Sequence, residues 1–124
     1  MSAALALIEH KQRLLFLKRS VLTSRPGQWC LPGGRINANE TPEEACIREV
    51  YEEAALKVKV RQLVLQSAQS YYFNCELLSE AVVRLNPRES SRFAWVDPLK
   101  LLKLGYIMDF RTVIPLLKDL GYPV

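Results

Sequence analysis

Four charged residues near the middle of the chain have types and spacing that could hold a metal ion. Arg48, Glu49, Glu52 and Glu53 lie within one short stretch, and on a helix the three carboxylates would fall within an arc of roughly 100°. Like charges at this spacing repel, which destabilises an isolated helix by roughly a few tenths of a kcal/mol per pair. A divalent cation would convert the repulsion into binding, because Mg2+ commonly takes one or two carboxylates together with substrate phosphate oxygens. The cluster therefore favours a metal site over a solvated acidic face.

A well-marked helix start would position these side chains. Thr41 is a suitable N-cap, Pro42 fits the first helical position, and Glu44 follows the threonine by three residues, as a capping box requires. The opposite arc of this helix is expected to face the core. That arc consists of Cys46, Ile47, Val50, Tyr51 and Ala54.

The spacing around the cluster resembles the Nudix box, Gly-x5-Glu-x7-Arg-Glu-U-x-Glu-Glu-x-Gly-U, where U is an aliphatic residue. The match runs from Gly34 through Glu40 to Leu56, and the preceding Trp-Cys-Leu-Pro-Gly-Gly at 29–34 extends it. Only Ala55 departs from the pattern, because the family has glycine there. A left-handed residue at a helix end would cost alanine about 1 kcal/mol. We expect the helix end to be altered or mildly strained, with activity retained because no catalytic atom is lost.

The reaction that the resemblance implies assigns metal ligands. Hydrolysis of a diphosphate needs metal ions that neutralise phosphate oxygens and lower the pKa of a bound water, together with a base. Mg2+ or Mn2+ would be held by the carboxylates of Glu49, Glu52 and Glu53. The backbone carbonyl of Gly33 or Gly34 would complete the shell.

Arg48 and Glu40 are expected to support the carboxylates. Arg48 lies too close to them to bind phosphate freely, and the resemblance implies that it orients Glu49 through a charge-assisted hydrogen bond. Glu40 precedes the helix and is expected to brace the loop rather than to take part in the chemistry.

Family members often use a further acidic residue outside the box as a ligand or base. Glu89 is the candidate, because it lies six residues before Trp95 in the loop that precedes a late strand. A solvated loop glutamate is an equal alternative, and Glu76 and Glu80 are weaker candidates. Whether Glu49 or Glu89 is the base stays open, because family members differ.

Residues outside the box are expected to select the substrate. Arg19 ends the strand before a loop and resembles a position that contacts phosphate in some members, and Arg25 could do the same from the loop. Either arginine could equally be a surface charge. Members that cleave ADP-ribose often have proline where Tyr71 stands, whereas members acting on diadenosine polyphosphates often have tyrosine near Tyr72. For Tyr72 a core or cross-strand role is an equal alternative.

The resemblance therefore implies a metal-dependent hydrolase of a small-molecule nucleoside diphosphate derivative, with water attacking phosphorus in line. A nucleoside triphosphate or dinucleoside polyphosphate is favoured over ADP-ribose. The alternative is a nucleotide- or RNA-binding module that keeps the fold without turnover. The complete carboxylate set favours the hydrolase, because a binding module has no need of three mutually repelling glutamates.

Length and composition predict a soluble globular protein of one domain, residues 1–124. The 17 Lys and Arg exceed the 13 Asp and Glu, and the net charge of +4 favours anionic partners. Because the basic residues are scattered, nucleic acid is disfavoured. Cys30, Cys46 and Cys75 are expected to be buried free thiols. With no apolar run long enough for a membrane span, we expect a cytoplasmic protein with no membrane partner. A homodimer is left open.

The remaining elements follow from short apolar runs and turn signals. Together they predict an α/β arrangement with a mixed β-sheet covered on both sides, and the family resemblance implies that this is a Nudix-like α/β/α sandwich. In the last helix, Pro115 would either kink the helix or move its start to about residue 114. The expected strands are 3–8, 13–17, a short strand running into a glycine turn at 29–34, 57–67, 69–77, 81–85 and 92–96, and the expected further helices are 98–103 and 109–120.

Overall fold

A strand that is apolar on both faces lies at the centre of the sheet. In the computed structural model, which describes residues 2–124, β1 (Ala3–His10) is buried from Ala4 to Ile8. It pairs in parallel with β6 (Ser70–Leu77) and antiparallel with both β2 (Arg13–Arg19) and β4 (Gly33–Arg35). A strand covered on both faces reads as a continuous apolar run, as Ala-Leu-Ala-Leu-Ile does here.

The other strands extend this sheet on both sides of β1. The order is β3-β2-β1-β6-β5, with β4 also paired to β1 and β7 to β2. Because parallel and antiparallel pairs coexist, the sheet is mixed, as predicted. The bounds of the added strands are Trp29–Cys30 for β3, Val58–Gln66 for β5 and Ser90–Val96 for β7.

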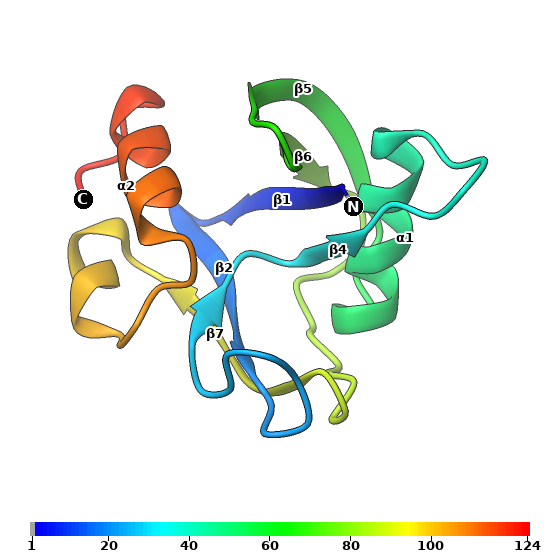
Figure 1. The fold of residues 1–124 in the computed structure, drawn as a ribbon. Coiled ribbons are helices and arrows are strands. Elements are labelled where there is room, and N and C mark those ends of the chain that lie inside the picture. The colour runs from blue at the N-terminus through cyan, green and yellow to red at the C-terminus, as the bar shows by residue number, and fades with distance from the viewer. Residues whose placement is uncertain (1) are drawn as a thin grey trace.

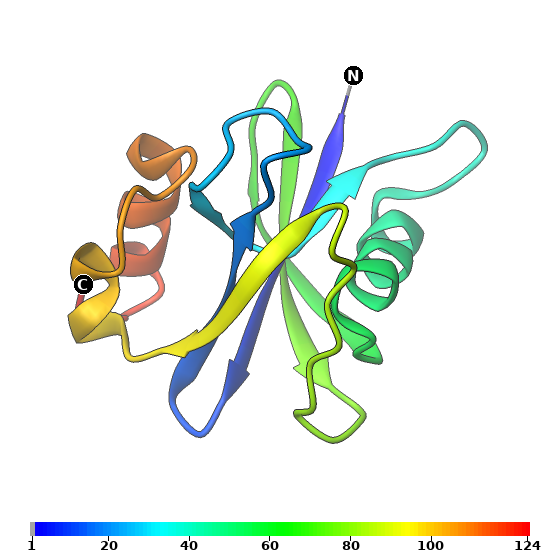
Figure 2. The ribbon, with the colours of Figure 1, turned by 90° about the horizontal axis from the view of Figure 1, so that it is seen from below.

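Helices cover both faces of the sheet, which gives the predicted α/β/α sandwich. Figures 1 and 2 show α1 (Pro42–Ala54) on one side, and the 3-10 helix η1 (Pro98–Lys103) with α2 (Phe110–Asp119) on the other. The core divides accordingly into a cluster under α1 and a cluster under α2. Within residues 2–124, no helix has the length and apolar character needed to cross a membrane.

The two ends of α1 confirm the signals read from the sequence. The Thr41 side chain accepts a hydrogen bond from the Glu44 backbone N–H, and the Glu44 carboxylate accepts one from the Thr41 N–H. At the other end Ala55 adopts the left-handed conformation, with φ 57° and ψ 31°, and donates to the Tyr51 carbonyl. The strain expected from alanine in place of glycine is therefore present.

Two sequence predictions about β-structure were wrong. Residues 81–85 form no strand. Their neighbourhood is hydrogen-bonded instead to the last turn of α1, where Arg84 N–H donates to the Ala54 carbonyl and Asn86 N–H to the Glu53 carbonyl. The last carbonyls of a helix lack intrahelical partners, so this segment satisfies them rather than joining the sheet. The glycine pair was expected to form a turn but begins β4, because its backbone pairs with β1.

Two residues of the expected core arc of α1 were also misplaced. Ile47 is 41% exposed and Tyr51 is 55% exposed, whereas Cys46, Val50 and Ala54 are buried as predicted. The buried arc of α1 is shifted from the predicted one, since Ala45 and Glu53 are buried instead of Ile47 and Tyr51.

The structure also tests the sequence predictions for the cysteines and for the last helix. All three cysteines are free and buried, as predicted, and the Cys46 and Cys75 sulfurs lie 3.7 Å apart. Helix α2 starts at Phe110 and continues through Pro115, so proline does not delay its start. Asp109 precedes it at φ 56° but makes no capping hydrogen bond with its side chain.

Replacing Ala55 with glycine is expected to raise the free energy of unfolding by about 0.5–1 kcal/mol, because glycine adopts the left-handed conformation without a steric penalty. Chemical denaturation of both proteins would measure the difference. Ala54→Gly is the matched control and should destabilise, because Ala54 is helical and buried. A destabilised Ala55→Gly variant would contradict the strain argument.

Candidate active site

The glycine pair lets β4 approach both β1 and the carboxylates of α1. At Gly33, whose φ is 146°, a Cβ atom would collide with the Ala4 carbonyl oxygen on β1. At Gly34 a Cβ atom would lie 2.5 Å from a carboxylate oxygen of Glu49. The Gly33 N–H donates a hydrogen bond of 2.7 Å to the Glu53 carboxylate. A side chain at Gly33 would therefore push β4 away from β1, and a side chain at Gly34 would displace the Glu49 carboxylate.

Three carboxylates meet beside these glycines. One oxygen each from Glu49, Glu53 and Glu89 lies within 4.8 Å of the others. Helix α1 supplies two of them, and the loop before β7 supplies Glu89. Glu53 is only 7% exposed. Closely spaced carboxylate oxygens of this kind suit a hard divalent cation such as Mg2+ or Mn2+.

Of the predicted metal ligands, Glu52 lies outside this cluster. Its side chain is 51% exposed and accepts a hydrogen bond of 3.1 Å from Arg48. The structure thus brings Glu49 and Glu53 together with Glu89 but leaves Glu52 at the exposed edge. Its part in metal binding stays a prediction, as does a role for the Gly33 or Gly34 carbonyl.

The carboxylates line a cavity of about 370 Å3 that we call the acidic hollow, defined by Glu49, Glu53, Glu89 and the glycine pair. Arg19, at the end of β2, lines it too, and its guanidinium donates to the backbone and side-chain oxygens of Ser24. Arg35, directly after the glycine pair, also lines it. Sequence reasoning missed Arg35, although its position next to Gly34 was a usable signal. Two guanidinium groups, of Arg19 and Arg35, beside three carboxylates suit a substrate with several phosphates.

Burial perturbs the acidity of the carboxylates. Burial, together with the neighbouring Glu89 and Glu49, raises the pKa of Glu53 to about 9, against the lowering effect of the Gly33 N–H. Burial also raises the pKa of Glu49, while Arg48 acts in the opposite direction. Without a cation Glu53 therefore retains its proton near neutral pH, and a bound cation would favour its ionised form.

Arg48 links the loop before α1 to the carboxylate cluster through hydrogen bonds. It donates two hydrogen bonds of 2.7 and 2.9 Å to Glu40, one of 2.8 Å to Glu49 and one of 2.9 Å to the Arg35 carbonyl. The pairing with Arg48 lowers the pKa of Glu40 to about 2, helped by the hydrogen bond that Glu40 accepts from the Asn37 N–H. The hydrogen bond to Glu49 is the one that the family resemblance implied.

Arg25 and Tyr72 do not reach the acidic hollow. Arg25 forms an ion pair of 3.0 Å with Asp109 and lines a different cavity. Tyr72 is 2% exposed and packs in the core cluster under α2. Its assignment to substrate binding is therefore corrected in favour of a core role. In β6 the residues on either side, Tyr71 and Phe73, pack in the other cluster, because strand residues alternate between faces.

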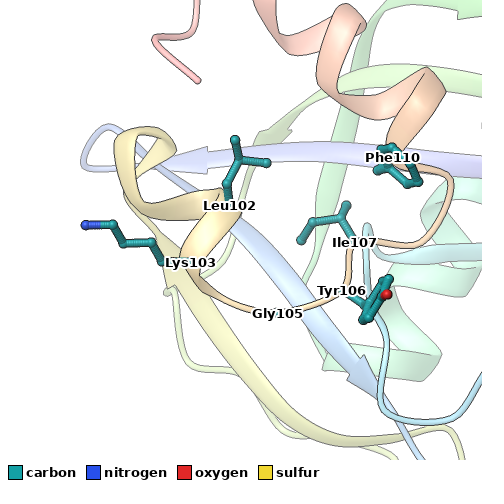
Figure 3. Close-up of a pocket in the computed structure, with 6 residues that line it drawn as sticks. All are labelled: Leu102, Lys103, Gly105, Tyr106, Ile107 and Phe110. Atoms are coloured by element: carbon teal, nitrogen blue, oxygen red, sulfur yellow. The ribbon is translucent and has the colours of Figure 1, made fainter.

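A second cavity, of about 380 Å3, lies beyond β3. Leu102, Gly105, Tyr106, Ile107 and Phe110 line it, and we call it the aromatic hollow (Figure 3). The Tyr106 side chain is 79% exposed and Phe110 is 50% exposed.

Strand β3 connects the two hollows. Trp29 N–H donates to the Tyr106 carbonyl, and Met108 N–H donates to the Trp29 carbonyl. Cys30, the next residue, lines the acidic hollow. Consecutive side chains of a strand point to opposite faces, and Trp29 packs in the core cluster under α2 while Cys30 packs in the one under α1, so the two hollows lie on opposite sides of β3.

The raised pKa of Glu53 should make the stability of the metal-free protein depend on pH. Between its ordinary pKa of 4.5 and its folded value of about 9, the folded state binds more protons than the unfolded state. The stabilising contribution of the protonated Glu53 carboxyl is complete below about pH 4.5. The free energy of unfolding should then fall as pH rises towards 9. Denaturant titrations in chelator at several pH values would measure this slope.

Glu53→Gln provides the control, because an amide cannot ionise. Its free energy of unfolding should change less over the same pH range, and Glu43→Gln, an exposed change on the same helix, should keep the wild-type slope. Equal slopes in wild type and Glu53→Gln would contradict the assignment to Glu53.

Comparison with known proteins adds to this geometry. A family model described as NUDIX domain matches residues 1–117. The chain is 30% identical to a MutT-like protein of Streptomyces ambofaciens over 103 residues, which cover 78% of this chain and 63% of that protein. It is 30% identical over 106 residues to a protein of Bacillus subtilis (strain 168) with the provisional name 8-oxo-dGTP diphosphatase, covering 80% and 67%. The chain spans about two thirds of the length of these two relatives.

Solved structures agree on the fold. The MutT protein from Methanosarcina mazei Go1 matches with a TM-score of 0.75 and 25% sequence identity. The match covers 98% of this chain and 95% of that one. The arrangement of sheet and helices described above is therefore shared along nearly the whole chain.

Proposed function

Since the chain belongs to the Nudix family, we propose that it hydrolyses a diphosphate linkage in a nucleoside diphosphate derivative with the help of Mg2+ or Mn2+. The observation that carries this proposal is the meeting of Glu49, Glu53 and Glu89 within 4.8 Å beside the glycine pair. The names of the relatives, a MutT-like protein and a nucleotide diphosphatase, support the same reaction class.

The three carboxylates of the acidic hollow and Arg48 have separate roles in this proposal. A bound divalent ion would neutralise phosphate oxygens and lower the pKa of the attacking water. Glu49, Glu53 and Glu89 hold the ion, and Arg48 keeps the Glu49 carboxylate in place. Either Glu49 or Glu89 accepts the proton of the water.

The phosphate chain of the substrate has its own contacts in the proposal. Arg19 and Arg35 bind its oxygens, because both line the same cavity as the carboxylates. A guanidinium can make two parallel hydrogen bonds to a phosphate. The positive charges would also offset the repulsion between a phosphate chain and three glutamates.

A binding module without turnover is the alternative. Burying a carboxylate such as Glu53 with two others nearby is unfavourable unless a cation is bound. Nucleotide binding alone does not require this arrangement, so the acidic cluster favours the hydrolase.

Turnover should depend on the carboxylates. With Mg2+ or Mn2+, Glu53→Gln and Glu49→Gln are each expected to lower kcat/KM by about 10²–10⁴-fold, the range typical of a lost base or of its equivalent in water activation. A panel of a nucleoside triphosphate, its 8-oxo form, a diadenosine polyphosphate and ADP-ribose would be assayed by phosphate or nucleotide release. Glu43→Gln should retain activity, because Glu43 is exposed in the first turn of α1. No turnover on any substrate would support the binding module, and unchanged turnover in both variants would contradict the roles proposed for the carboxylates.

The aromatic hollow is proposed to hold the part of the substrate beyond the phosphates. It lies across β3 from the acidic hollow, and its exposed Tyr106 and Phe110 rings offer apolar surface to a base. The ion pair between Arg25 and Asp109 lies in the cavity that shares these rings and adds polar groups. Mostly apolar lining with a few polar groups is the usual composition of small-molecule sites.

Phe110→Ala is therefore expected to raise KM by about tenfold for the best substrate of the panel with little change in kcat, because one base-stacking contact contributes about 1–3 kcal/mol. Steady-state kinetics would separate the two parameters. Leu120→Ala, a change at another exposed apolar residue, at the far end of α2, should leave KM unchanged. An effect on kcat alone would place the substrate elsewhere.

A further inference from the structure

Glu89 lies outside any helix or strand, so its position depends on how its loop is held. The loop runs over residues 78–89 between β6 and β7. Its first anchor is Asn86, whose N–H donates to the Glu53 carbonyl at the end of α1. Asn86 also accepts hydrogen bonds from Glu89 N–H through its carbonyl and from Arg88 N–H through its side chain. This anchor ties Glu89 to the helix that carries the other two carboxylates.

A second anchor comes from Ser20, directly after β2. Its hydroxyl donates a hydrogen bond of 2.6 Å to the Arg88 carbonyl, and its backbone N–H donates one of 2.9 Å to the Glu89 carbonyl. The same hydroxyl accepts from the Leu22 N–H at 3.2 Å. Ser20 is one of the few buried polar residues, at 4% exposure. Both peptide groups that flank the Glu89 side chain are thus held from β2.

We propose that Ser20 is a positioning residue, whose hydroxyl holds the Glu89 carboxylate at the metal cluster. This inference rests on the proposed function, in which Glu89 binds the ion or takes the proton of water. The backbone hydrogen bond alone leaves the Arg88 carbonyl free to move. An isolated loop of this length has few internal contacts to fix its shape, and a displacement of about 1 Å can impair a site of this kind.

Metal affinity gives a direct readout of this role. Mn2+ binding, followed by electron paramagnetic resonance, is expected to weaken about tenfold in Ser20→Ala, the effect usual for losing a group that orients a ligand. Ser20→Thr keeps a hydroxyl and should restore most of the affinity. Ser20→Cys keeps the side-chain volume but only a weak donor, and it should weaken binding in the same direction, so the test does not depend on folding of the alanine variant.

A double-mutant comparison separates positioning from a general loss of structure. In a Glu89→Gln background, Ser20→Ala should weaken Mn2+ binding no further, because its effect passes through Glu89. The matched control is Ser79→Ala. The Ser79 hydroxyl also accepts a backbone N–H, from Lys57, and donates to a backbone carbonyl, that of Glu80, but at the exposed far end of the same loop. The Ser79→Ala variant should leave Mn2+ binding unchanged.

Unchanged Mn2+ affinity in Ser20→Ala and Ser20→Cys would overturn the inference. So would an equal weakening by Ser20→Ala in the wild-type and Glu89→Gln backgrounds. Failure of the wild-type protein to bind Mn2+ would instead reject the proposed function itself. Because the readout needs no turnover, the two failures are distinguishable.

Discussion

Burial of a carboxylate next to two others is the constraint on which the site depends. Glu53 occupies a position of α1 that packs under the sheet edge, where a side chain of 7% exposure cannot be solvated by water. Desolvation favours its protonated form, and the nearby Glu49 and Glu89 add to that effect. A cation between the three groups removes the conflict. The electrostatic cost of the free site is therefore also the source of its affinity for metal.

The surrounding backbone is shaped by these carboxylates. Gly33 donates its N–H to Glu53, and neither Gly33 nor Gly34 has room for a Cβ atom, since one would meet β1 and the other Glu49. Arg48 connects Glu49 with Glu40 and with the carbonyl of Arg35. Among residues 2–124, no buried side-chain oxygen or nitrogen lacks a hydrogen-bond partner. The acidic helix is thus held by partners on the adjoining strand and loop.

The sheet determines which hollow each loop serves. Strand β3 places Cys30 at the acidic hollow and pairs Trp29 with residues of the aromatic hollow. The loop before β7 reaches the cluster because Ser20 on one side and Asn86 on the other hold it. In the proposed enzyme, the phosphates and the remainder of the substrate would therefore lie on either side of one short strand.

The local features of α1, and the reaction class that its residue spacing implies, could be predicted without the structure. Capping at Thr41, the left-handed Ala55 and the common face of Glu49 and Glu53 depend only on neighbours within a few residues, so the pattern was sufficient. The hydrogen bond from Arg48 to Glu49 also lies within one turn.

Which distant residues meet depends on how the whole chain packs. Glu89 is separated from Glu53 by two strands and a loop, and its meeting with the helix depends on contacts with Ser20 and Asn86. Tyr72 is buried in the core cluster that also contains residues of α2. The segment at 81–86 forms no strand, and its Arg84 and Asn86 N–H groups bond to the last carbonyls of α1. These outcomes depend on long-range packing and hydrogen bonding, which spacing along the chain does not encode.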